Sequence, residues 1–285
     1  MVISVSRRCD IPRFAFDWFL EKLEAGFVEV KNPFNARQIR RVSLQPPQIF
    51  AFWTRDPTAI LEYAEELEGR GYCFYVMTTI TAYPEILEPG APSLEAVIQS
   101  MKKLAQKITL DRLIWRYDPV FLSNITNFEF HRRNFASLAG RLNDAVKRVI
   151  VSVYDEYPRA EKRLAALEQT RPSGSLPFKR LPHYTEDKLL RPEVRDLLGE
   201  LAEIAKNEGM EIQSCAEENL SEQGIKSGAC IDGDYINSLF GPKTSGKTHL
   251  QKARFQRQRC LCAESVDIGS YGCCPAGCVY CYGLS

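Results

Sequence analysis

Three closely spaced cysteines near the end of the chain have the residue type and spacing of a metal–sulfur site. They lie in the stretch GSYGCCPAGCVYCYGLS, where Cys274, Cys278 and Cys281 follow the pattern C-x3-C-x2-C. Thiolates are soft ligands that select zinc, copper(I) or iron–sulfur clusters. A structural zinc site usually takes four ligands as two pairs, whereas three thiols together suit a cluster with one iron left open. The triplet therefore predicts an iron–sulfur cluster.

A second group of four cysteines provides another candidate metal site. Its members are Cys215, Cys230, Cys260 and Cys262. Four thiols match the number of ligands that zinc or a second, auxiliary cluster requires. The alternative is that they are buried apolar side chains, which is common for cysteine. Cys273 is left out because adjacent thiols rarely bind one centre, and Cys9 and Cys73 are expected in the core or in loops.

The composition is that of an ordinary globular protein. The chain has 285 residues, of which 45% are hydrophobic and 26% charged, and its net charge of +1 favours no particular partner. Its start lacks the features of a signal peptide, and no apolar run approaches the ~20 residues that span a bilayer. We therefore expect a cytoplasmic protein with no membrane partner. Disulfides do not persist in that compartment, so clustered cysteines indicate metal or redox chemistry.

Short apolar runs alternate with helix-like segments over most of the chain. We expect strands at 2–6, 48–54, 72–80, 112–118, 147–155 and 210–217, with a weaker candidate at 27–30. We expect helices at 16–26, 56–71, 93–108, 127–144, 158–169 and 191–209. Such alternation predicts an α/β fold with parallel strands, and a full or partial TIM-like (β/α) barrel fits the strand number. A doubly wound sheet is the alternative, although no G-x-G-x-x-G motif follows the first strand.

Polar side chains gather where the expected strands end, which is where β/α folds place their active sites. The set comprises Arg7, Arg8, Asp10, Thr54, Arg55, Thr78, Thr79, Arg116, Tyr117, Asp118, Tyr154, Asp155, Ser214, Cys215 and Glu217. For any single member, the alternative is a helix cap or an ion pair that holds a loop. Arg116 and Asp118 share a strand face because alternate residues point the same way. They form a buried pair or hold a polar substrate or cofactor carboxylate, and we take them as candidate catalytic residues.

The cysteine triplet, with an aromatic residue before its last member, resembles the signature of radical S-adenosylmethionine enzymes. The resemblance implies a 4Fe-4S cluster on Cys274, Cys278 and Cys281, whose open iron binds the methionine part of S-adenosylmethionine. One electron from the cluster would cleave this cofactor to a 5′-deoxyadenosyl radical, which abstracts hydrogen from an unidentified substrate. We place Tyr280, the aromatic residue, at the cofactor. The resemblance also implies an electron donor such as flavodoxin or ferredoxin, and a full or partial barrel.

Stretches spread over nearly the whole chain resemble the uncharacterised family called domain of unknown function 1848. They are SRRCDIP, NPF, FWTRDP, TTITAY, WRYDP and ESVDIGSYGCCPAGCVYCYG. The C-terminal cysteines of that family are similar to those of radical S-adenosylmethionine enzymes. The superfamily carries its triplet after the first strand, whereas here it ends the chain. We therefore expect a barrel-like domain over 1–220 and a Cys-rich iron–sulfur tail over 221–285 that folds back over the C-terminal ends of the strands.

Two further sequence signals compete with this interpretation. The segment GPKTSGKT (241–248) matches the P-loop pattern, but DYINSLF before it is a weak strand, so we expect a flexible loop. Residues 241–259 carry six basic and no acidic residues, and a solvated basic helix is the expected structure. Contact with an anionic cluster or with nucleic-acid phosphates is the alternative for this block.

A different class of function also fits the cysteines. In this alternative the chain is a non-catalytic iron–sulfur or zinc protein for electron transfer, sensing or nucleic-acid binding. Zinc or clusters would then stabilise the tail without turning over a substrate.

Overall fold

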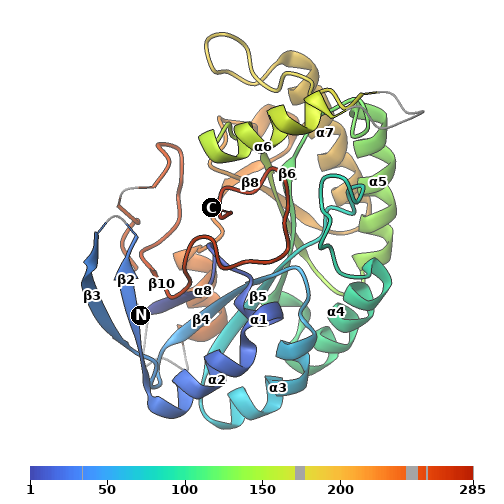
Figure 1. The fold of residues 1–285 in the computed structure, drawn as a ribbon. Helices are drawn as coiled ribbons and strands as arrows, with labels where there is room; N and C mark the ends of the chain where they lie inside the picture. The colour runs from blue at the N-terminus through green and yellow to red at the C-terminus, as the bar shows by residue number, and fades with distance from the viewer. Residues whose placement is uncertain (34, 171–176, 242–249, 255, 285) are drawn as a thin grey trace.

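The main body of the structure is a single sheet of parallel strands with helices along its outer side (Figure 1). The computed structural model describes residues 1–33, 35–170, 177–241, 250–254 and 256–284. Within these residues the sheet has eight strands in the order β10-β1-β4-β5-β6-β7-β8-β9. The strands are β1 (Val2–Val5), β4 (Ile49–Thr54), β5 (Cys73–Thr79), β6 (Leu113–Val120), β7 (Arg148–Val153), β8 (Glu211–Cys215), β9 (Lys226–Gly228) and β10 (Val266–Asp267).

Helices follow most of these strands and form an arc around the sheet (Figure 1). They are α1 (Ile11–Phe14), α2 (Phe16–Ala25), α3 (Thr58–Gly69), α4 (Leu94–Ile108), α5 (Phe128–Leu142), α6 (Pro158–Gln169), α7 (Pro192–Asn207) and α8 (Gly233–Phe240), with 3-10 turns at Leu110–Arg112 and Ser221–Gln223. None of the described helices is long and apolar enough to cross a lipid bilayer.

The six strong strands and six helices expected from the sequence are present, and the differences lie mainly in the last quarter of the chain. Strands β9 and β10 were missed because runs of three and two residues carry no periodic signal. The prediction of a weak strand at DYINSLF is wrong, because this segment lies in α8. At the start of α8, the Asp232 carboxylate accepts hydrogen bonds from the Asp234 and Tyr235 amides. The P-loop-like residues 242–249 lie outside the described part of the chain.

The weak candidate at 27–30 is a strand, but it does not join the main sheet. It becomes β2 (Phe27–Asn32), which pairs antiparallel with β3 (Asn35–Ser43) in a separate hairpin. In β2, Val28 is buried whereas Glu29 is exposed, as expected for a hairpin with one face in water.

The strand order decides between the two architectures that the sequence left open. From β1 to β9 the strands of the main sheet follow each other in chain order, whereas a doubly wound sheet reverses direction at a switch point. The doubly wound alternative therefore does not fit. No pairing joins β9 to β10 within the described residues, so closure into a barrel stays a prediction. Both of these strands come from the predicted tail, 221–285, yet they form the two edges of the main sheet.

Strands such as β4 are buried on both faces, which is why they read as continuous apolar runs. Phe50 and Phe52 face the helices, where the ring of Phe19 packs edge-on against both at 5.3 and 5.5 Å. Ala51 and Trp53 point to the opposite face and pack in a second cluster with Tyr75 of β5. We call this opposite side the inner face of the sheet.

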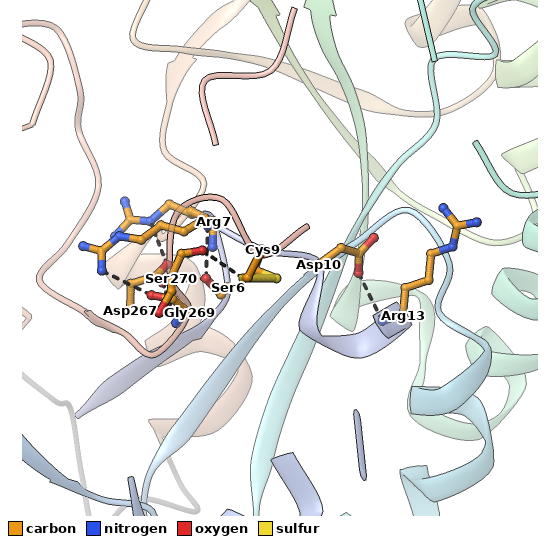
Figure 2. Close-up of a disulfide and its surroundings, with 10 residues drawn as sticks. Ser6, Arg7, Cys9, Asp10, Arg13, Asp267, Gly269 and Ser270 are labelled. Atoms are coloured by element: carbon orange, nitrogen blue, oxygen red, sulfur yellow. Dashed lines mark hydrogen bonds and ion pairs between the residues drawn. A yellow bond between two sulfur atoms is a disulfide. The ribbon is translucent and has the colours of Figure 1, made fainter. Parts of the chain in front are cut away.

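The buried carboxylate of Asp267 fastens β10 to the N-terminal strand. It accepts hydrogen bonds from the hydroxyls of Ser4 at 2.7 Å and Ser6 at 2.5 Å, and from the amide of Arg7 at 2.8 Å. Gly269 donates its own amide to the same carboxylate at 3.0 Å. Figure 2 shows how closely Gly269 lies to Ser6. This junction brings the start of the terminal segment to the end of β1.

We predict that Gly269→Ala destabilises the protein, because its methyl group would lie 2.1 Å from the Ser6 hydroxyl and 2.6 Å from its Cβ. Overpacking of this kind typically costs about 1–3 kcal/mol. The matched control is Gly69→Ala at the end of α3, where the added methyl group would meet no atom within 4 Å beyond its own helix backbone and chain neighbours. We expect this change to be neutral or slightly stabilising. Urea denaturation of both variants measures the difference, and equal stabilities would contradict the prediction.

Candidate functional site

A cavity of about 500 Å³ lies at the C-terminal ends of the strands. It is lined by all ten residues that we singled out for the site: Arg116, Asp118, Tyr280, Cys215, Cys230, Cys260, Cys262, Cys274, Cys278 and Cys281. Most of the predicted strand-end residues line it too, whereas Thr78, Tyr117, Ser214 and Glu217 do not. Ser214 and Glu217 line a smaller cavity of about 330 Å³ beside β8 and β9.

The terminal loop with the cysteine triplet packs against the segments that follow β5, β6 and β7. Ala276, Cys278 and Tyr280 form a buried cluster with side chains such as Tyr83 and Phe121. In Figure 1 the same loop, in dark red, crosses the region enclosed by the helices. The loop is thus held at the strand ends by its own apolar side chains.

Backbone contacts fix the path of this loop. The Gly90 amide donates to the Ala276 carbonyl at 3.0 Å, and the Val279 amide donates to the Leu87 carbonyl at 2.9 Å. Gly277 adopts φ +69°, a left-handed conformation that favours glycine. Arg163 of α6 donates to the carbonyls of Val279 and Cys281. The turn between the first two cysteines of the triplet is therefore built from glycine and from hydrogen bonds to fixed neighbours.

The buried ion pair between Arg55 and Glu88 holds the hydroxyl group of Tyr280 in place. Arg55 pairs with Glu88, whose side chain is fully buried, and the Tyr280 hydroxyl donates to the same carboxylate. Arg55 also donates to the Thr81 hydroxyl at 2.8 Å. Sequence analysis missed Glu88, because it lies in the loop after β5 among residues with no helix, strand or motif signal. The hydroxyl of Tyr280 is thus engaged by protein groups, while its role at a cofactor stays a prediction.

The second cysteine group is brought together on the inner face of the sheet. The sulfurs of Cys215 and Cys230 lie 3.3 Å apart. Cys262 lies close enough to Cys215, Cys230 and Cys260 for all three to influence its thiol. All four are buried free thiols. The grouping predicted from ligand number alone is therefore also a grouping in space.

Neither thiol group has the arrangement of a ready-made metal site. Among the described residues, no set of three or more His, Cys, Asp or Glu side chains is placed so that it could hold a metal ion as it stands. In the second group the sulfurs of Cys215 and Cys230, 3.3 Å apart, lie closer than the ~3.8 Å that separates sulfurs around a tetrahedral zinc ion. Burial also raises the pKa of the Cys278 thiol to about 12, so a metal would have to displace that proton.

The chemistry of the triplet nevertheless suits an anionic cluster. Its three thiols are each close enough to influence the others electrostatically. The Gly283 amide donates to the Cys281 sulfur at 3.2 Å. The positive charge of Arg55 acts on Cys278. Amide donors and nearby cations are the protein groups that stabilise thiolate-bound clusters.

Arg116 and Asp118, the candidate catalytic pair, form an ion pair with each other at the cavity wall. Ser152 donates to Asp118, and Arg116 donates to Thr79 at 3.0 Å. The Arg116 guanidinium also lies over the Trp53 ring at 4.8 Å. The two residues are therefore paired with each other, but the pair is partly exposed at the cavity and not fully buried. Their catalytic role stays a prediction.

Cys9 is buried in the loop after β1, as expected. A disulfide joins it to Cys273, although we expected no disulfides. It links the loop after β1 to the residue directly before Cys274, across a sequence separation of 264. Figure 2 shows Cys9 between the Asp267 junction and Asp10. Sequence spacing could not reveal this pairing, because it depends on the terminal segment returning to the first strand.

Asp10 is a buried acid that the strand-end pattern identified without indicating its state. Its carboxylate accepts from the amides of Arg13 at 3.2 Å and Arg55 at 2.8 Å. Burial, the largest cause, raises the pKa of Asp10 to about 6. Asp10 lines the cavity, so it is a group that titrates near neutral pH beside the site.

We predict that Glu88→Ala costs about 3–5 kcal/mol of stability, since it leaves Arg55 buried without its partner. Glu85→Ala, an exposed glutamate in the same loop, should change the stability by less than about 0.5 kcal/mol. Urea denaturation of both variants measures these effects. A loss of under about 1 kcal/mol for Glu88→Ala would show that the ion pair does not hold the loop.

Asp10 gives a prediction for the pH dependence of stability. Its folded pKa of about 6 exceeds the value of about 3.9 in an unfolded chain. The proton is therefore bound more tightly in the folded state, and the stability it contributes is present below about pH 4 and lost as the pH rises through about 6. The loss amounts to about 3 kcal/mol. Urea denaturation at several pH values should show that Asp10→Asn removes this fall, and an unchanged pH profile would refute the assignment.

The comparisons with known proteins agree with the family that the sequence motifs indicate. Residues 2–283 match the family model described as Domain of unknown function (DUF1848). No curated protein matches the chain. Since the match spans nearly the whole sequence, the chain belongs to the family described as domain of unknown function 1848.

Proposed function

We propose that this protein is an iron–sulfur enzyme of the radical S-adenosylmethionine type, with a 4Fe-4S cluster on Cys274, Cys278 and Cys281. One observation supports this above the others. The three thiols of the terminal motif line the same cavity as the polar ends of β1, β4, β5, β6 and β7. A cluster there would face the place where β/α enzymes bind substrates.

The cluster would supply one electron for the reductive cleavage of S-adenosylmethionine, and the residues of the chain would bind and orient the reactants. The cavity wall carries the arginines Arg7, Arg8, Arg55, Arg116 and Arg257. Arg116 and Asp118 offer a cation and an anion side by side, which suits the carboxylate and amino groups of an amino-acid moiety. Tyr280, fixed by Glu88, would position the motif loop and contact the cofactor with its ring.

The same proposal includes the architecture around the site. The strand order suits a (β/α) barrel. In it, the Cys-rich tail over 221–285 would contribute β9 and β10 to the sheet and cap the C-terminal ends of the strands with its last residues. We further propose a cytoplasmic location and a flavodoxin or ferredoxin as electron donor, because the cluster would need a one-electron reductant. Substrate and product are not identified by the cavity.

The alternative function, a non-catalytic iron–sulfur or zinc protein, is favoured by one specific observation. Four of the buried thiols lie close together and would fill every position of a single tetrahedral ion. A closed site of this kind has no open position for a substrate. It accounts for the second group but leaves the triplet without a role.

Anaerobic reconstitution with iron and sulfide tests the proposal. We predict a brown protein whose visible absorbance bleaches with dithionite and which forms 5′-deoxyadenosine from S-adenosylmethionine. Cys278→Ala should reduce this product to background, since it removes one ligand of the triplet. Cys73→Ala is the matched control, because Cys73 is also buried but does not line the cavity.

Two results would contradict the proposed function. One is a reconstituted wild-type protein that holds its iron but forms no 5′-deoxyadenosine. The other is a Cys278→Ala variant that retains both the iron and the product.

A further inference from the structure

Within the described residues, one backbone-to-backbone hydrogen bond joins the segment that follows β9 to the segment that precedes β10. The Ala263 amide, shortly before β10, donates to the carbonyl of Ile231, shortly after β9, at 2.8 Å. These two strands are the edges of the main sheet. We call the region where the two segments meet, residues 229–232 and 260–263, the seam.

The second cysteine group lies at this seam. Cys215 is the last residue of β8 and pairs with Gly228 of β9, while Cys230 follows two residues later. Cys260 and Cys262 belong to the returning segment, where the Ile231 amide donates to the Cys262 sulfur at 3.5 Å. The four thiols therefore come from both sides of the seam and from the strand beside it.

Three arginine side chains lie close to these thiols. The Arg257 guanidinium lies 3.8 Å from the Cys215 sulfur. Arg7 acts electrostatically on Cys262 and Cys230, and Arg116 acts on Cys230. A zinc ion with four thiolates carries a net negative charge, so cations at this distance stabilise it. Cysteines that are only buried apolar side chains carry no charge for these cations to stabilise.

We propose that Cys215, Cys230, Cys260 and Cys262 form a structural zinc site that closes the seam between β9 and β10. The closeness of the sulfurs favours one ion over a cluster. A shift of about 0.5 Å would take a 3.3 Å contact to the separation found around tetrahedral zinc. A four-iron cluster binds each cysteine to a different iron, and its ligands lie further apart. This site goes beyond the proposed function and does not rest on it.

Zinc binding here replaces the protons of the cysteine thiols. Every cysteine that carries its proton releases it to solvent, and the ion takes the four sulfurs as ligands with no change in oxidation state. Zinc would stabilise the folded state because it would bridge the two segments of the seam. In the described part of the chain, one backbone-to-backbone hydrogen bond joins them. In the unfolded chain the site does not exist, so binding favours folding.

Metal analysis of the full-length protein, purified without added iron, tests the site. We expect one zinc per chain in the wild type, in Cys73→Ala and in Cys278→Ala. Cys230→Ala and Cys262→Ala should each lose the zinc and melt at a lower temperature. The Cys278→Ala protein separates the two proposals, because it lacks the triplet but keeps the seam cysteines. It should form no 5′-deoxyadenosine and still contain zinc.

A second measurement uses the wild type alone, in case the seam variants do not fold. Cobalt(II) replacing zinc should give the visible absorption of a tetrahedral thiolate site. Alkylation followed by peptide mass spectrometry should show Cys215, Cys230, Cys260 and Cys262 protected by the metal. A wild type without zinc when grown with zinc, retention of zinc by Cys230→Ala, or iron at these four cysteines would each overturn the proposal.

Discussion

The position of the terminal cysteine loop depends on the buried carboxylate of Glu88. It binds Arg55 from the end of β4 and Tyr280 from the middle of the motif, so one acid joins the strand ends to the loop. Burying this carboxylate without partners would cost several kcal/mol. The loop is therefore restricted to conformations in which Arg55 and Tyr280 both reach Glu88. This restriction places Cys278 and Cys281, on either side of Tyr280, at the cavity. The loop is held by charge and hydrogen bonding as well as by apolar packing.

The two groups of cysteines line the same cavity, but different parts of the fold place them there. Cys215 reaches it through the alternation of a strand, because β8 directs every second residue to the inner face. Cys278 reaches it through a loop that returns over the strand ends. A site placed on a strand is held more rigidly than one on a loop. That difference fits the roles proposed here, a closed structural ion at the seam and a cluster that must remain accessible at the mouth.

The sequence was sufficient to predict the strands and helices with strong periodicity, and to identify residues that the structure brings together at one cavity. Alternation along β6 correctly placed Arg116 and Asp118 on one face, and ligand counting grouped four distant cysteines that do lie together. It failed where a contact joins distant segments without a local signal. Glu88, the Asp267 junction and the Cys9–Cys273 disulfide all depend on the C-terminal segment returning to the first strands. Strands as short as β10 exist only because the neighbouring strand supplies their hydrogen bonds, so no pattern within them could have predicted them.

The charges at the cavity wall indicate why this arrangement suits bound metal. Arg7, Arg55, Arg116 and Arg257 are each paired with a carboxylate, so these arginines add little net charge to the wall. Arg8 instead lies over the Tyr271 ring and donates to the Gly269 carbonyl. Deprotonating the thiols to bind metal would add negative charge, which zinc or iron offsets only in part. Arginines are the cations best able to share a carboxylate and face a second anion, because the guanidinium has five donors. The wall can therefore accept metal–thiolate charge without losing the ion pairs that hold the strand ends.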